Sequence, residues 1–439
     1  MEDIISLAEK PVIVEGGLVW KTFFSSYWLK TPVLYKNPFG APVFSQTEIL
    51  ELLKRYQADL SRKVKRDITV YNKHRSSTMG ILNSERINTG IEDLLPNQQA
   101  DDLMAYFDQL SEKKGFEEFC IYINDAHSDE EIWKKCYGLL KYINQHMSSI
   151  PSKISCDFFI GNYEKTNFGA HRDPIDNMMF MVFGSRRMLT WSDELWKKGL
   201  GNPDSNSFIK LDYEVHREAA TAYTLEPGDL LYWPSTYWHV GENDGQLSAS
   251  FNLDFPTSGN DLLADEIIKK SMTDALKEVA KKLFRENGHY AGTLPRNEAG
   301  DLPGHYLQSS NQIAEKLHYS DIQTQIESNW LAKISSAGMM KPIPVNKATV
   351  ANDQLLAEST ERPILSRLIG ETLTISSGGH IVQVRSAIEQ FKEVINQVKT
   401  TTSFTIDELS TRCATPEVSK AVIAGFLQRL YAIQALELS

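Results

Sequence analysis

The stretch GAHRDPIDN, residues 169–177, places His171, Arg172 and Asp173 side by side. Two chemistries use these residue types. A protein-kinase catalytic loop reads His-Arg-Asp, four further residues and then Asn. A non-haem iron site reads His-x-Asp and takes a second histidine from elsewhere in the chain. The surrounding sequence distinguishes the two.

The kinase pattern fails in its spacing and in its context. It requires Asn at position 178, but that residue is Met178 and the asparagine comes one position early. No GxGxxG loop precedes the motif, and the nearest approach to a downstream DFG is Asp254-Phe255-Pro256, which lacks the glycine. Without an aspartate to hold magnesium, phosphoryl transfer has no charge neutralisation. We therefore set the kinase interpretation aside.

The iron-site pattern fits its surroundings better. On a β-strand, residues i and i+2 point to one face, so His171 and Asp173 can share a metal ion while Arg172 points away. The third ligand has to be a histidine from a later strand, and His239 in EPGDLLYWPSTYWHVG follows a turn, an apolar strand and a proline-containing loop. Two histidines and one carboxylate leave three positions open on Fe(II). A lone histidine in an aromatic strand is usually a core residue, so the prediction rests on the joint pattern.

The other histidines have a different context. They lie in polar or helical stretches, in the charged segment EVHREA or in a Gly-Gly turn: His74, His127, His146, His216, His289, His305, His318 and His380. None of these surroundings resembles the strand that carries His239.

Two adjacent arginines follow in FGSRRMLTW, residues 183–191. On a strand only one of Arg186 and Arg187 can face the interior of a barrel. A guanidinium binds a carboxylate with two parallel hydrogen bonds, whereas a buried, unpaired arginine is strongly unfavourable. We therefore predict an anionic ligand for Arg186. Arg186 lies an odd number of residues after His171, which on one continuous strand would place the two on opposite faces, but a bend at Gly184–Ser185 could reset the register. Two alternatives therefore remain: Arg187 faces the interior instead, or Arg186 forms a salt bridge at the rim of the barrel.

The elements around these residues are short strands. Segments rich in aromatic and β-branched residues, separated by Gly, Pro and Asn, run from about 154 to 256, which is typical of an antiparallel barrel or jelly roll. The spacing predicts helices in FSQTEILELLKRY and over 129–147, and helices return after Pro256. Near the C-terminus, ETLTISS and HIVQVRS flank a Gly-Gly turn and helical patterns follow, which indicates a winged-helix-like module.

Composition limits the class of protein. The chain has 439 residues, of which 41% are hydrophobic, and a net charge of −11, which disfavours nucleic acid as a partner. Its four cysteines show no CxxC spacing, as expected in a reducing compartment. The N-terminus does not read as a secretory signal, and no apolar run is long enough to span a membrane. These features predict a cytoplasmic protein.

The HRD motif, the spacing of Arg186 and EPGDLLYWPSTYWHVG together resemble the JmjC-type, cupin-fold, Fe(II)/2-oxoglutarate-dependent hydroxylases, and most of all the bacterial ribosomal oxygenases. FFSSYWLKTPVLYKN, residues 23–37, is similar to the entry strand of those proteins. The resemblance implies an α+β fold with a double-stranded β-helix (cupin/jelly-roll) core and flanking helices. It implies three parts: a JmjC/cupin catalytic domain at 1–257, a helical segment at 258–345 and a winged-helix-like domain at 346–439.

The resemblance also implies roles for individual residues. His171, Asp173 and His239 would ligate Fe(II), and Arg186 would pair with the distal carboxylate of the cosubstrate 2-oxoglutarate; O2 is the oxidant. Asn177 and Asn252 stand where some members keep amides near the cosubstrate, although Asn177 reads equally well as a turn residue. Arg172 departs from the pattern, since many relatives carry Tyr there.

The substrate is less determined. The architecture favours hydroxylation of an amino-acid side chain in a protein or peptide over lysine demethylation. Hydroxylation of a small metabolite and a non-enzymatic, metal-binding cupin sensor are the alternatives. Residues 361–439 contain equal numbers of basic and acidic residues, so their net charge does not favour DNA binding. This segment is better interpreted as a protein-docking module or as a scaffold. The helical segments between 260 and 336 either form a homodimer interface or pack on their own barrel.

Overall fold

The computed structural model describes residues 10–73, 84–87, 90–113, 116–147, 153–165, 169–194, 213–243, 245–256, 273, 319–339 and 349–439. The chain divides into two compact units. The N-terminal unit comprises Met1–Thr257 with Gly338–Ile343, and the C-terminal unit comprises Ser258–Ala337 with Pro344–Ser439. Of the helical segments expected between 260 and 336, only residue 273 and residues 319–336 are among the described residues.

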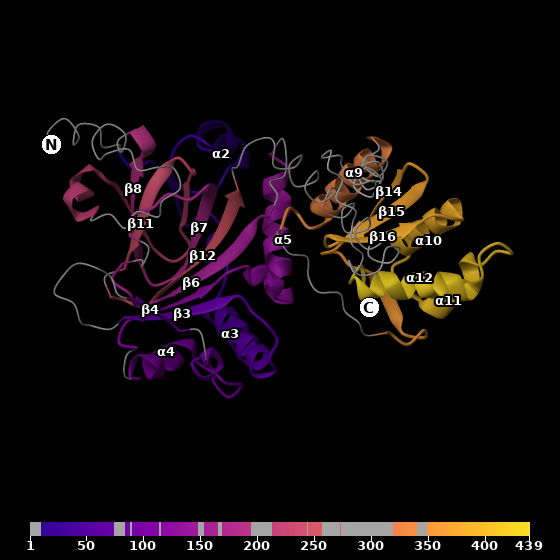
Figure 1. Cartoon of the computed structure of the whole chain (residues 1–439), viewed down its shortest axis with the longest axis horizontal. Coiled ribbons are helices and arrows are strands. Elements are labelled where there is room, and N and C mark those ends of the chain that lie inside the picture. Colours follow the sequence, from indigo (N-terminus) through magenta and orange to yellow (C-terminus); the bar gives the residue numbers. More distant parts are fainter. Residues whose placement is uncertain are drawn as a thin grey trace, which may run out of the picture. The chain divides into compact units, whose positions relative to one another are not determined.

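The N-terminal unit contains a nine-stranded sheet (Figure 1). All its neighbouring strands are antiparallel except β1 and β2. In spatial order the strands are β1 (Ile13–Glu15), β2 (Val33–Lys36), β10 (Leu230–Trp233), β7 (Ile175–Phe183), β12 (Ser248–Pro256), β6 (Ser155–Gly161), β5 (Phe119–Ile123), β3 (Ile68–Lys73) and β4 (Ser84–Ile87).

A second, three-stranded sheet completes the barrel. Its order is β11 (Tyr237–Glu242), β8 (Arg186–Ser192) and β9 (Thr221–Leu225), all antiparallel. A core cluster joins the two sheets, since Met179 and Leu231 of the large sheet pack with Met188 and Tyr223 of the small one. The strands predicted between 154 and 256 are therefore present, in the antiparallel arrangement that the sequence indicated.

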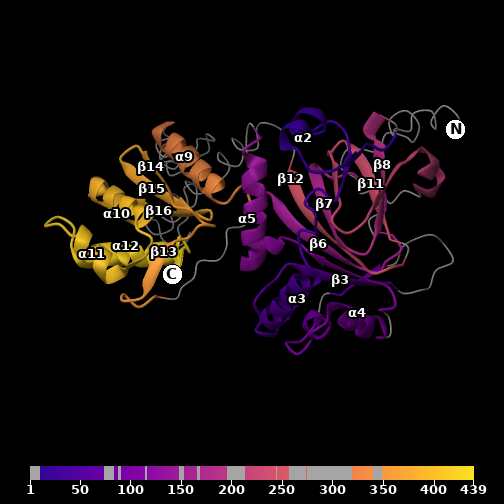
Figure 2. The ribbon, with the colours of Figure 1, turned by 180° about the vertical axis from the view of Figure 1, so that it is seen from behind.

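Helices cover the outside of this unit, as Figure 2 shows from behind. They are α2 (Trp20–Ser26), α3 (Gln46–Ser61), α4 (Leu103–Ser111) and α5 (Glu130–Asn144), with short 3-10 turns η1 (Ile91–Asp93), η2 (Ala126–Ser128) and η3 (Tyr213–Ala219). α3 begins where Ser45 and Glu48 form a reciprocal capping box. α5 begins at Asp129, whose side chain accepts from the backbone N–H of Glu131 and Ile132. Both helices were expected from the sequence.

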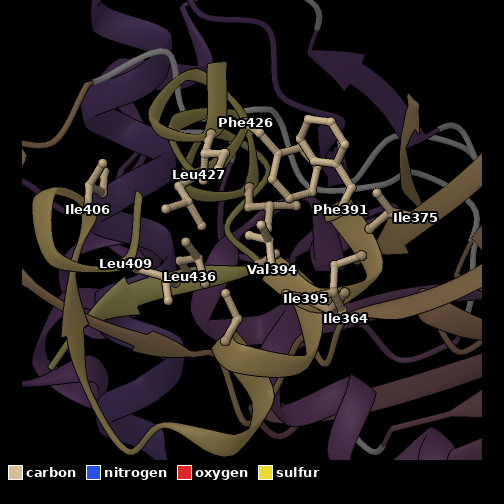
Figure 3. Packing of buried hydrophobic residues seen from close by; sticks show 14 of the residues in the cluster. Ile364, Ile375, Phe391, Val394, Ile395, Ile406, Leu409, Phe426, Leu427 and Leu436 are labelled. Carbon is tan, nitrogen blue, oxygen red and sulfur yellow. The ribbon is translucent and has the colours of Figure 1, made fainter. Parts of the chain in front are cut away.

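The C-terminal unit has its own hydrophobic core (Figure 3). Phe391 and Phe426 meet edge to face with ring centroids 4.9 Å apart, and Val394, Leu409 and Leu427 fill the space around them. The unit contains α9 (Tyr319–Ser335), α10 (Ile388–Thr400), α11 (Ile406–Cys413) and α12 (Lys420–Ala432). Its two small sheets are β17 (Phe404–Thr405), β13 (Leu355–Glu358), β18 (Leu436–Leu438) and β14 (Leu365–Ile369), β15 (Thr372–Ser377), β16 (His380–Val384).

The expected hairpin is present in this unit, because β15 and β16 pair on either side of Gly378 and Gly379. Together the two units are α+β, as predicted. Among the described helices, none combines the length and the apolar character needed to cross a bilayer.

Candidate functional site

The HRD segment lies against β11. The backbone N–H of His171 donates to the carbonyl of His239 (3.0 Å), and the N–H of His239 donates back (2.8 Å). We expected a strand at His171, but the segment forms an isolated bridge and belongs to no strand. Pro174, which follows at once, has no N–H to extend the ladder. The two histidines are thus direct neighbours although they are far apart in the sequence.

The three predicted ligands converge. Nε2 of His171 lies 3.4 Å from Oδ2 of Asp173, and Nε2 of His239 lies 3.7 Å from the same oxygen. One donor atom from each of the three side chains lies within 4.8 Å of the others. Two imidazoles and one carboxylate within this distance are a donor set that fits Fe(II). In the described residues no other group of three His, Cys, Asp or Glu side chains has this geometry.

Two members of the triad, Asp173 and His239, are in the protonation state that cation binding requires. Burial raises the pKa of Asp173, but the hydrogen bond from His171 and the charges of both histidines outweigh it and leave the pKa below its usual value. Burial and the charge of His171 lower the pKa of His239 to about 3. Burial also lowers the pKa of His171, yet the hydrogen bond and charge of Asp173 raise it more. Asp173 is therefore ionised and His239 neutral at neutral pH.

The orientation of the His171 ring is fixed from outside the triad. Its Nδ1 lies 2.9 Å from the carbonyl oxygen of Gly169, which assigns the proton to Nδ1 and turns Nε2 toward Asp173. On the other side, the ring of Trp233 packs on His239 with centroids 4.9 Å apart. Such contacts to the second ring nitrogen and the ring face hold a ligating imidazole in place.

Arg186 faces the same cavity as the triad, whereas Arg187 is exposed. The Arg186 side chain is buried, with the residue 2% exposed, and its Nη1 and Nη2 donate to Ser250 Oγ (2.7 Å) and Ser248 Oγ (3.0 Å). Nε has no hydrogen-bond partner. Within the described part of the chain no carboxylate pairs with this guanidinium. The groups that contact it are neutral: the two hydroxyls and the ring of Tyr163, whose centroid lies 5.3 Å from Cζ.

The bend before Arg186 explains why it points inward. Gly184 has φ +69°, and a Cβ there would collide with the carbonyl oxygen of Leu247. This left-handed residue ends β7 and resets the alternation, so that Arg186 and Met188 both line the cavity.

The predicted amides also line the cavity. Nδ2 of Asn177 donates to Oδ1 of Asp254, whereas Oδ1 of Asn177 and Oδ1 of Asn252 have no hydrogen-bond partner. Burial raises the pKa of Asp254 well above its usual value, and the charge and hydrogen bond of the neighbouring Asp157 add to the effect. Asp157, also with a raised pKa from burial, accepts from Tyr122 Oη at 2.8 Å. Both shifts favour the protonated form of a carboxyl in this pair.

The sequence reasoning missed the alternating polar face of β12. Ser248, Ser250, Asn252 and Asp254 occupy every second position, and the residues between them are Ala, Phe, Leu and Phe. This alternation in SASFNLDF was a readable signal, because residues two apart on a strand share a face. Only Asn252 was selected from it.

The cavity that these residues enclose has a volume of about 300 Å³. Its remaining wall is mostly apolar and aromatic, with Tyr122 and Phe159 stacked at 4.5 Å and Trp233, Met179 and Met188 beside them. A partly apolar pocket with few convergent polar groups is the usual form of a small-molecule site.

Residues 135–260 match the family model of the JmjC domain. The matched range includes the triad, Arg186 and β12, and the resemblance seen in the sequence is confirmed. The chain therefore contains a JmjC domain, and this domain together with the triad indicates an oxygenase with Fe(II) and 2-oxoglutarate as its cofactors.

No curated protein matches the sequence. Among solved structures, the X-ray structure of Escherichia coli ycfD is similar with a TM-score of 0.51 and 16% identity, covering 96% of this chain and 98% of that one. Another structure of YcfD, described as a ribosomal oxygenase from Escherichia coli, has a TM-score of 0.49, 16% identity and the same coverage. Its complex with cobalt and 2-oxoglutarate has a TM-score of 0.49 and 14% identity, again with that coverage. At these identities the likeness concerns the fold.

Proposed function

We propose that this chain hydroxylates an amino-acid side chain of a protein or peptide, using Fe(II), 2-oxoglutarate and O2. The observation that carries the proposal is the convergence of His171, Asp173 and His239 in the cavity that Arg186 also enters. A metal triad and an uncompensated, buried guanidinium in one 300 Å³ cavity are what a dicarboxylic keto acid requires at its two ends.

The residues would act as follows. His171, Asp173 and His239 hold the iron. Arg186, oriented by Ser248 and Ser250, pairs with the distal carboxylate of 2-oxoglutarate, and its free Nε–H and its two Nη groups are the donors available for that pairing. When bound, iron and 2-oxoglutarate supply the oxidation of an unactivated C–H bond by O2, with succinate and CO2 as coproducts. Asn177 and Asn252 offer polar contacts beside the cosubstrate, and the aromatic wall excludes water.

The first substrate to test is suggested by a protein of similar fold. The E. coli protein with a similar fold is called a ribosomal oxygenase, and a ribosomal protein is the substrate we would test first. We also propose the three-part organisation 1–257, 258–345 and 346–439, with the last part a winged-helix-like module. Its balanced charge supports docking of a protein or peptide, or scaffolding, over binding of DNA. A homodimer through the segment 258–345 stays a prediction.

The first experiment measures succinate. Purified protein is supplied with Fe(II), ascorbate, 2-oxoglutarate and ribosomal proteins, and modified peptides are sought by their gain of one oxygen. We expect Asp173→Ala to abolish succinate formation, because the triad loses its only carboxylate, while circular dichroism stays unchanged. The exposed Asp101→Ala is the control. Full turnover in Asp173→Ala would remove this residue from the site. If wild type consumed no 2-oxoglutarate with any substrate and shifted DNA in gels, the sensor alternative would replace the enzyme.

The second experiment tests the cosubstrate contact. We expect Arg186→Ala to raise the KM for 2-oxoglutarate by about 10-fold or more, because a charge-assisted hydrogen bond contributes roughly 1.5–3 kcal/mol. The adjacent Arg187→Ala is a matched control, since that side chain is exposed. The reverse result, with the effect in Arg187→Ala alone, would shift the assignment by one residue.

A further inference from the structure

One carboxylate oxygen outside the cavity connects the two segments that carry the triad. Oδ1 of Asp193 accepts from Nη1 of Arg172 at 2.6 Å and from Nε1 of Trp238 at 3.3 Å. Arg172 stands between two members of the triad in the sequence, and Trp238 directly precedes the third. Because side chains alternate along an extended chain, Arg172 and Trp238 point away from the side that carries the ligands. We call Arg172, Asp193 and Trp238 the outer clamp.

The outer clamp adds side-chain contacts between the HRD segment, the end of β8 and β11. The HRD segment itself belongs to no strand, and the two backbone hydrogen bonds of the His171–His239 bridge join it to β11. Asp193, by contrast, directly follows β8, and its backbone N–H donates to the carbonyl of Thr236 at 3.1 Å. The guanidinium of Arg172 also lies 5.8 Å from the centroid of the Trp238 ring, within the range of a cation–π contact. The outer clamp thus links the HRD segment to β11 on the side that faces away from the ligands.

The charges of the outer clamp bear on metal binding as well. A guanidinium on the residue between two ligands would repel a cation if it were unpaired, and Asp193 neutralises it. Both side chains are partly exposed, at 24% and 22%, and an ion pair this accessible to water contributes little to global stability. The effect of the pair should therefore be seen in the triad and not in the unfolding of the chain.

We propose that Arg172 and Asp193 are positioning residues that set the spacing between the HRD segment and β11, so that the triad is preformed for its metal ion. The proposal rests on the metal-binding role of the triad proposed above.

The test is a titration of the metal-free protein with Co(II), followed by visible absorption of the bound ion, alongside its melting temperature. We expect Arg172→Met to raise the Kd for Co(II) by about 10-fold, the lower end of the range for residues that orient metal ligands. Arg172→Lys should restore part of the affinity, since it keeps the charge without the planar geometry. The melting temperature of the metal-free protein should change little in both variants.

The matched control is another arginine–aspartate pair of the same unit. Arg55 donates to Asp129 through Nε at 2.7 Å and Nη2 at 2.9 Å, and neither residue lines the cavity. Arg55→Met should lower the melting temperature, because Asp129 caps α5, and leave the Kd for Co(II) unchanged. A merely structural Arg172 would behave like Arg55.

A double variant tests whether the two residues act together. Asp193→Asn should weaken Co(II) binding at least as much as Arg172→Met, because it leaves an unneutralised guanidinium beside the ligands. Arg172→Met/Asp193→Asn should bind no more weakly than either single variant, as for two residues of one interaction. A Kd within twofold of wild type in Arg172→Met and Asp193→Asn would overturn the proposal. Equal Kd values for wild type and His239→Ala would instead overturn the proposed metal site, and with it the outer clamp.

Discussion

At the scale of single residues, the cavity region contains a buried positive charge and a pair of buried carboxyl groups. Arg186 is a buried charge held by two hydroxyls, whereas the pKa values of the buried carboxyls of Asp157 and Asp254 are raised. Burying an ionised group without a partner is unfavourable, and the arginine and the carboxyls avoid this in different ways. The arginine cannot lose its proton and therefore calls for an anion, whereas Asp254 can stay protonated.

The carboxyl pair makes stability depend on pH. Because the pKa of Asp254 is raised in the fold, the unfolded chain loses this proton first. The contribution of Asp254 to stability therefore falls as pH rises above about 4, by at most ~1.4 kcal/mol per pH unit until the folded pKa is reached. Asp254→Asn keeps the hydrogen-bonding shape without an ionisable group. We expect this variant to gain stability relative to wild type between pH 5 and pH 7.5, measured by urea unfolding.

Asp101→Asn, at an exposed carboxylate, is the control and should show no such trend. A stability difference between Asp254→Asn and wild type that is the same at both pH values would contradict the raised pKa of Asp254.

At the scale of elements, the turn between β7 and β8 decides which arginine enters the barrel. Gly184 adopts a left-handed conformation against the backbone of Leu247 and Ser248, and Ser248 in turn accepts a hydrogen bond from Arg186. A side chain at position 184 would therefore disturb both the bend and the β12 residues that orient Arg186.

Gly184→Ala is expected to destabilise the protein by about 1–2 kcal/mol from backbone strain alone, with the collision adding to this, and to raise the KM for 2-oxoglutarate. Thermal unfolding and steady-state kinetics measure the two effects. Gly138→Ala is the matched control: Gly138 lies within α5, a Cβ there meets nothing within 4 Å, and alanine should stabilise the helix by up to ~1 kcal/mol. If both variants had equal stability, the argument for a required bend would fail.

At the scale of the whole molecule, the chain has two units with separate cores, and all members of the triad belong to the N-terminal unit. A ligand stabilises only the structure that binds it, by about 2.7 kcal/mol at 100 times its Kd. We therefore expect scanning calorimetry to show two transitions, of which Co(II) raises only one.

The assignment of that transition can be checked in the same experiment. His239→Ala should abolish the shift caused by Co(II) and leave the other transition where it is. A single transition, or a shift of both by the same amount, would show that the two units unfold as one.

Much of the fold could be predicted locally. The strands between 154 and 256, α5 and α10 follow from hydrophobic spacing, and the capping box that begins α3 is legible as Ser45 followed by Glu48. The isolated bridge at His171 was not predictable in the same way. A strand pattern reports which face a residue prefers, but the length of a ladder depends on the partner strand and on the backbone N–H that Pro174 lacks.

The sequence by itself determined the ligand types, because HxD and a histidine after PGD…P are patterns of composition and spacing within a few residues. Only the tertiary structure decided that these side chains meet, that Arg186 and not Arg187 faces them, and that Ser248, Ser250 and Asp254 join them. The physical reason is that metal and anion sites are made by contacts between strands distant in the chain. Their register is set by a glycine bend and by packing, which no local pattern of residues encodes.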